Sequence, residues 1–90
     1  MMWYVYILCC ADNTLYTGVT TDIERRLREH NSKDIGAKYT RAKRPVTLVY
    51  HETAKNRSQA LQKEAAIKKL SKQEKEDLTR TSGYANIEPC

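Results

Sequence analysis

The first twenty residues constrain the fold most, because they predict two β-strands joined by a tight turn. Residues 3–10 and 15–20 are short runs rich in Tyr, Val, Ile and Thr, which are residue types that favour strands. Between them, Asp12-Asn13-Thr14 supplies the turn chemistry that closes a hairpin. A chain of 90 residues allows one domain with a modest core. The hairpin is therefore expected to belong to a single small sheet.

A helix and a third strand are expected to follow the hairpin. A Thr-x-x-Glu capping box at residues 21–24 predicts a helix that runs to about Asn31. Residues 32–45 show no periodicity and are interpreted as an exposed loop. The apolar run at residues 46–50, entered through a proline, predicts the third strand.

Two further helices complete the predicted order. One is expected over residues 57–70 with Asn56 as its N-cap, and a second capping box at residues 71–74 starts the other. Gly83 is a natural stop for that last helix, so we expect a domain over residues 1–82 and a tail over 83–90. The order is β-β-α-β-α-α, which predicts an α+β fold with a three-stranded antiparallel sheet flanked by helices.

The composition indicates a globular protein of the cytoplasm. Hydrophobic residues make up 40% of the chain and charged residues 30%, and no apolar run approaches the roughly 18 residues that cross a bilayer. The opening segment lacks the positively charged start of a signal peptide, so neither export nor a membrane partner is expected. Cys9, Cys10 and Cys90 lack the spacing of a metal or redox motif and are expected to be reduced.

Basic residues are concentrated in two stretches of the chain. The net charge is +5, and Lys and Arg outnumber Asp and Glu by eight to four both in residues 21–44 and in residues 55–80. A basic surface attracts phosphate backbones and raises encounter rates. The alternative is a solvated helix surface, which charge alone slightly favours.

Several side chains are candidates for chemistry, and each has a structural alternative. Tyr4, Tyr6 and Tyr16 lie on strands that must pair, but buried tyrosines are usually core residues. Arg26 and His30 are four residues apart and therefore share one helical face. Taken alone, they are better explained as a solvated charge and a helix-end histidine that favours the helix dipole.

Glu64 is the most informative of these candidates. It shares a predicted core-facing stripe with Ala60, Leu61 and Ile67, where a hydrophobic residue would be expected. Burying a carboxylate costs several kcal/mol unless it is paired or binds a cation. A salt bridge to a residue such as Arg26 and a ligand role for Mg²⁺ or Mn²⁺ are about equally supported by the physics.

The order of these motifs resembles the GIY-YIG nuclease family. Tyr4-Val5-Tyr6 and Tyr16-Thr17-Gly18 resemble its paired signature, and residues 21–30 resemble its first-helix motif, Asp-Ile/Leu-x-x-Arg-x-x-x-His. The segments at residues 36–40 and 60–70 resemble the small stand-alone bacterial YhbQ-like members. The similarity covers about residues 3–80.

The resemblance implies a fold, a site and a cofactor. It implies catalytic roles for Tyr6, Tyr16, Arg26 and His30, with Glu64 holding one divalent cation, Mg²⁺ or Mn²⁺. All five residues are expected to converge on one sheet face. The expected contacts to backbone phosphates come from four basic residues of the loop, Lys38, Arg41, Lys43 and Arg44.

The function implied is hydrolysis of DNA phosphodiester bonds by a metal-dependent endonuclease in DNA repair or processing. DNA is favoured over RNA as the partner, and a protein partner that supplies substrate specificity is a further expectation. The alternatives are a non-catalytic nucleic-acid-binding module and a recruitment domain on the same scaffold.

The nuclease mechanism makes two physical demands. Tyr6 can act as general base only if neighbouring cations lower its pKa from about 10. Tyr6 and Tyr16 must also face the same side of the sheet, which requires a hairpin register of equal parity, for example residue 10 with 16 and 6 with 20.

Overall fold

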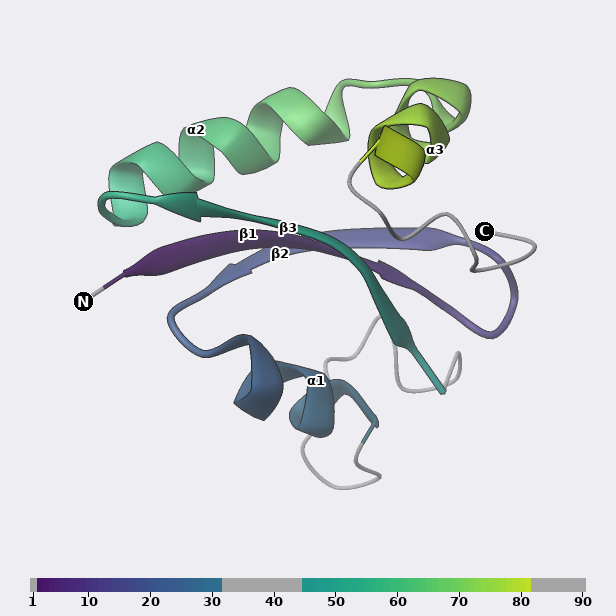
Figure 1. Ribbon diagram of the computed structural model, residues 1–90, viewed down its shortest axis with the longest axis horizontal. Coiled ribbons are helices and arrows are strands. Elements are labelled where there is room, and N and C mark those ends of the chain that lie inside the picture. Colours follow the sequence, from purple (N-terminus) through teal and green to yellow (C-terminus); the bar gives the residue numbers. More distant parts are fainter. Residues whose placement is uncertain (1, 32–44, 82–90) are drawn as a thin grey trace.

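The computed structural model describes residues 2–31 and 45–81, which form one sheet and three helices (Figure 1). The elements in chain order are β1 (Trp3–Cys9), β2 (Leu15–Thr20), α1 (Ile23–Asn31), β3 (Thr47–Ala54), α2 (Arg57–Lys68) and α3 (Lys72–Thr81). The predicted α+β class and element order are confirmed. Across the described ranges, no helix combines the length and the apolar character that crossing a membrane requires.

The hairpin of β1 and β2 has the predicted parity. Asn13 takes a φ of 69°, a left-handed conformation that asparagine tolerates, and the Asp12 carboxylate accepts a hydrogen bond from the Thr14 amide at 3.1 Å. Tyr6 lies opposite Gly18 and Leu8 opposite Tyr16. The pairs given above as examples are therefore displaced by two residues, but the requirement of equal parity is met.

The third strand is longer than predicted and carries a bulge. β1 is central in the strand order β2-β1-β3, and β3 pairs with it in antiparallel fashion from Thr47 to Ala54. The prediction that this strand ends at residue 50 was wrong. The polar residues that follow indicated an end, but their backbone continues the ladder with β1. Ile7 pairs with Tyr50 but Leu8 pairs with Leu48, so β3 has one extra residue there.

The predicted helix starts are confirmed for α2 and α3 and shifted by one residue for α1. Asn56 caps α2 by accepting the Gln59 amide at 2.8 Å. Ser71 and Glu74 form a reciprocal capping box, with bonds of 3.1 and 3.0 Å. At α1 the cap is Asp22, whose carboxylate accepts an amide hydrogen bond at 3.1 Å, rather than the Thr21 of the predicted box.

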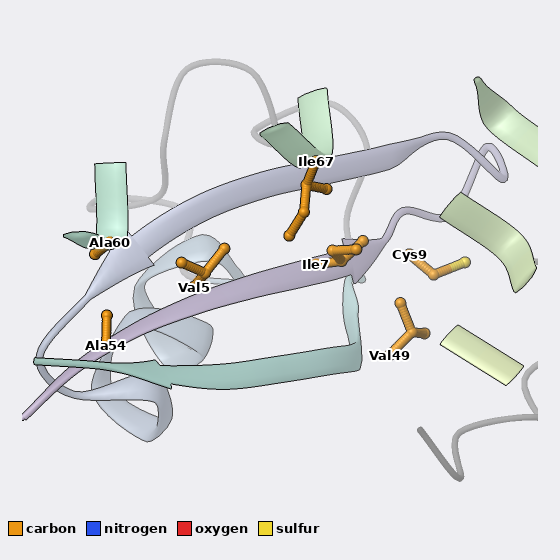
Figure 2. Packing of buried hydrophobic residues seen from close by; sticks show 7 residues of the cluster. All are labelled: Val5, Ile7, Cys9, Val49, Ala54, Ala60 and Ile67. Carbon is orange, nitrogen blue, oxygen red and sulfur yellow. The ribbon is translucent and has the colours of Figure 1, made fainter. Parts of the chain in front are cut away.

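Helices cover both faces of the sheet. Figure 1 shows α2 and α3 on one side of the strands and α1 on the other. The first side holds the larger core, formed by Val5, Ile7, Cys9, Val49, Ala54, Ala60 and Ile67 (Figure 2). The α1 side holds a second cluster, formed by Tyr6, Leu8, Cys10 and Val46 with Tyr16, Leu27 and Leu48 packed against it. Alternate residues of β1 therefore feed two cores.

One cysteine differs from its prediction. Cys10 is buried and not disulfide-bonded, as expected, whereas Cys9 is disulfide-bonded. The expectation that all three cysteines are reduced is therefore wrong for Cys9, because spacing along the chain does not show which cysteines the fold brings together.

Candidate functional site

Three aromatic side chains meet between the sheet and α1. Tyr6 comes from β1, Tyr16 from β2, and His30 from the last turn of α1. The ring centroid of His30 lies 6.0 Å from that of Tyr6 and 5.0 Å from that of Tyr16, and the two tyrosine rings are 6.4 Å apart. The equal-parity register and the single helical face together bring these residues to one place.

A hydrogen bond links the two most buried members of this cluster. The Tyr6 hydroxyl and His30 Nε2 are 3.0 Å apart, with Tyr6 only 2% exposed and His30 fully buried. Burial, reinforced by the nearby positive charge of Arg26, lowers the pKa of His30 to about 4, so the imidazole is neutral near pH 7. Arg26 lies close enough to the Tyr6 oxygen to lower the pKa of Tyr6 through hydrogen bonding and charge, and a neutral imidazole with an unprotonated Nε2 accepts the Tyr6 O–H.

Tyr6 does not have the lowered pKa that a free tyrosinate base requires. Burial raises the pKa of Tyr6 to about 12, and this outweighs the hydrogen bond and the charge of Arg26, which act in the opposite direction. The neighbouring charge of Glu64 raises it further. The expectation of a lowered pKa is thus not met by the protein's own charges.

Arg26 is placed to bridge the cluster and solvent. Its side chain is 32% exposed, and its Nη1 donates to the Glu29 carboxylate at 3.0 Å, one turn further along α1. The salt bridge considered above between Arg26 and Glu64 is therefore replaced by a local pair with Glu29. A guanidinium with one side bonded and one side near solvent suits a phosphate oxygen.

Gly18 is a site residue that the sequence motif contained but that we assigned no role. It lies opposite Tyr6 in the hairpin, and a Cβ at this position would lie 2.5 Å from the Tyr6 hydroxyl oxygen and 3.2 Å from Tyr16. Only a residue without a side chain lets the Tyr6 ring lie across β2. The signal in the sequence was a glycine inside a predicted strand, which often marks a close approach of another group to the backbone.

Glu64 approaches the cluster from the other layer. It lies on α2, which packs on the opposite face of the sheet from α1 (Figure 1), so the expectation that all five residues share one face is wrong for Glu64. Its side chain is 19% exposed and pairs with Lys68 at 3.6 Å. Because its charge acts on the pKa of Tyr6, the two groups are within electrostatic reach.

The stripe that singled out Glu64 is only partly a core stripe. Ala60 and Ile67 are buried as predicted, but Leu61 is 39% exposed. Glu64 therefore lies at the margin of the α2 core rather than inside it, where a carboxylate can reach solvent and ligands.

The donor chemistry around Glu64 suits a loosely held hard cation. Within residues 2–31 and 45–81, no three His, Cys, Asp or Glu side chains gather into a cage for a metal ion. Mg²⁺ commonly binds through one or two carboxylates, with water and substrate phosphates completing its shell. A single half-buried carboxylate fits that pattern, and it does not fit a structural zinc site.

Four of the predicted contacts cannot be placed. Lys38, Arg41, Lys43 and Arg44, expected to bind backbone phosphates, lie outside the described residues, as does the motif at residues 36–40.

Comparison with known proteins defines the class that this fold and cluster represent. Residues 2–77 match the GIY-YIG catalytic domain family, and the chain belongs to that family. The nucleases of this family depend in general on divalent metals and act on nucleic acid.

Within the family, the similar proteins are small UPF0213 proteins of bacteria and archaea. One from Desulfotalea psychrophila is 58% identical over 87 residues, covering 94% of this chain and 79% of that protein. One from Staphylococcus haemolyticus is 51% identical, covering 80% of this chain and 87% of that protein. The solution NMR structure of a UPF0213 protein from Bacillus halodurans has a TM-score of 0.59 at 43% identity, covering 92% of this chain and 87% of that one.

Proposed function

We propose that this protein is a metal-dependent endonuclease that hydrolyses DNA phosphodiester bonds in the cytoplasm, in DNA repair or processing. The observation that carries the proposal is the hydrogen-bonded pair of Tyr6 and His30, with Arg26 and Glu64 both close enough to act on the same hydroxyl. Tyr16 packs against both rings of the pair. A purely structural core would have no need for an arginine, a histidine and a carboxylate around one buried tyrosine.

The pair supports proton transfer without a free tyrosinate. As the attacking water gives its proton to the Tyr6 oxygen, Tyr6 gives its own proton to His30 Nε2, 3.0 Å away. A concerted transfer avoids the cost of ionising a tyrosine whose pKa is about 12. A phosphate bound to Arg26 would offset the positive charge that depresses the pKa of His30, which makes the imidazole a better acceptor when substrate is present.

Two groups would neutralise the negative charge of the phosphate, namely the Arg26 guanidinium and a cation held by Glu64. Arg26 presents guanidinium donors toward the phosphate oxygens, and Glu29 holds that side chain in place through its 3.0 Å pair. Glu64 is the residue that would hold the divalent cation, which supplies neutralisation of the phosphate and of the leaving oxygen when bound. The Lys68 ammonium now beside Glu64 would have to move from that carboxylate.

The proposal is tested by cleavage of end-labelled single-stranded, duplex and branched DNA with Mg²⁺, Mn²⁺ or EDTA. We expect wild type to cut at least one substrate only with metal, and Glu64→Ala to lose that activity. Glu74→Ala is a matched control, because Glu74 is an exposed carboxylate that caps α3. If wild type and Glu64→Ala bind DNA alike and neither cuts, the nuclease proposal fails, and a binding or recruitment module remains.

A further inference from the structure

The outer edge of β2 borders two adjoining hollows that the proposed reaction does not use. One, of about 260 Å³, is lined by Leu15, Tyr16, Thr17, Lys68 and Lys75. The other, of about 210 Å³, is lined by Thr14, Leu15, Lys72 and Lys75. Leu15 and Lys75 belong to both, so the hollows form one continuous surface between β2 and the α2–α3 junction, which we call the lysine groove.

The spacing of two lysines along α3 places positive charge in the lysine groove. Lys72 and Lys75 are three residues apart and share one helical face. Glu74 and Asp77, also three apart, line a separate hollow with Leu70 and Leu78. The α3 residues that line the lysine groove are therefore both lysines, and Lys68 from the end of α2 adds a third ammonium to it.

The groove is continuous with the candidate site at two points. Tyr16 lines the groove and also packs against His30, with ring centroids 5.0 Å apart. Lys68 lines the groove and pairs with Glu64 at 3.6 Å. An extended chain that has one phosphate at Arg26 would therefore meet the groove as it leaves the site.

A different hollow is unsuited to the same ligand. The hollow between Tyr4, His51 and the start of α1 is bordered by the carboxylates of Asp22 and Glu24, which repel phosphate. Another hollow, which includes Lys55 and Lys63, is also basic, but none of the candidate-site residues line it. The lysine groove combines positive charge with continuity to the site and is therefore the favoured path of a polyanion.

We propose that the lysine groove binds the sugar–phosphate backbone of the nucleic-acid strand beside the phosphate that is cut. Lys68, Lys72 and Lys75 contact successive phosphates, and the aliphatic and aromatic surface of Leu15 and Tyr16 contacts sugars or bases. Such contacts are independent of sequence and strongly dependent on salt. The inference deepens the proposed function in that the bound strand is the one that the site cuts.

The test is binding of a fluorescein-labelled oligonucleotide, followed by anisotropy in EDTA over a series of KCl concentrations. For Lys72→Gln/Lys75→Gln we expect an affinity loss on the order of tenfold at low salt. The slope of log affinity against log salt should fall by about one for each lysine removed. The matched control is Lys55→Gln/Arg57→Gln, which removes the same charge at the opposite end of α2 and should retain more of the affinity.

Three results decide the inference separately from the nuclease proposal. Recovery of binding in Lys72→Arg/Lys75→Arg supports it, because the charge is restored without the original side chains. Equal losses in the groove and control variants overturn it, since net charge alone would then explain binding. Groove-dependent binding by a wild-type protein that cuts nothing would support the groove while removing the nuclease function.

Discussion

At the scale of single residues, the site depends on how closely Tyr6 approaches its neighbours. Its ring lies over Gly18, its hydroxyl is hydrogen-bonded to His30, and its oxygen lies within reach of the Arg26 guanidinium. Each contact fixes one property of the tyrosine, namely its position, the direction of its proton and its charge environment. Burial dominates the last of these and holds the tyrosine protonated.

Gly18→Ala should displace the Tyr6 ring. The new methyl would lie 2.5 Å from the Tyr6 oxygen and 2.7 Å from its Cζ, so the ring or β2 must shift. We expect a stability loss of about 1–3 kcal/mol, measured by urea unfolding, together with loss of DNA cleavage. In a Tyr6→Ala background the same substitution should cost much less. An equal cost in both backgrounds would show that the strain lies in the backbone and not against Tyr6.

At the scale of elements, the sequence predicted what local chemistry determines. The strands of the hairpin, the Asn56 cap and the Ser71–Glu74 capping box were found as expected, because their signals lie within a few residues. The end of β3 was missed, since the polar run of residues 51–53 conceals a backbone ladder that only pairing with β1 reveals.

The candidate site likewise contains residues that the sequence motif predicted and features that it could not predict. The motif placed Tyr6, Tyr16, Arg26 and His30, and the structure brings these four together. The layer from which Glu64 arrives could not be predicted, because helical periodicity does not say which sheet face a helix covers. The raised pKa of Tyr6 could not be predicted either, since it depends on burial by α1 rather than on the count of nearby cations.

At the scale of the whole molecule, the two hydrophobic clusters pack on opposite faces of one sheet, and the α1 side also encloses a buried histidine. His30 is enclosed within the α1-side cluster, where Tyr6 and Tyr16 face it from the sheet and Arg26 and Glu29 act on it from α1. Without a bound phosphate to offset the charge of Arg26, that enclosure favours a neutral imidazole over an imidazolium.

Global stability should therefore fall in mild acid. The pKa of His30 is about 4 in the folded protein and near 6.5 when exposed, so between these values the unfolded chain binds more protons. The contribution of His30 is complete above about pH 6.5 and is lost as the pH falls toward about 4. Urea unfolding across this range should show the loss in wild type, with a shallower dependence in His30→Met. His30 resonances, assigned by their loss in His30→Met, that titrate near 6.5 by NMR in the folded protein would contradict this account.

The central claim, that the Tyr6 hydroxyl is the reacting centre of a nuclease, is tested most directly by comparing two tyrosine variants. Tyr6→Phe and Tyr50→Phe each remove one hydroxyl, but Tyr50 donates its hydrogen bond to Glu52, a residue that also pairs with Lys63 at 2.9 Å on α2. Metal-dependent cleavage of labelled DNA would be measured under single-turnover conditions, at a temperature where circular dichroism shows both variants folded. We predict that Tyr6→Phe loses at least about 100-fold in rate and that Tyr50→Phe stays close to wild type. Cleavage by Tyr6→Phe at the wild-type rate would contradict the claim.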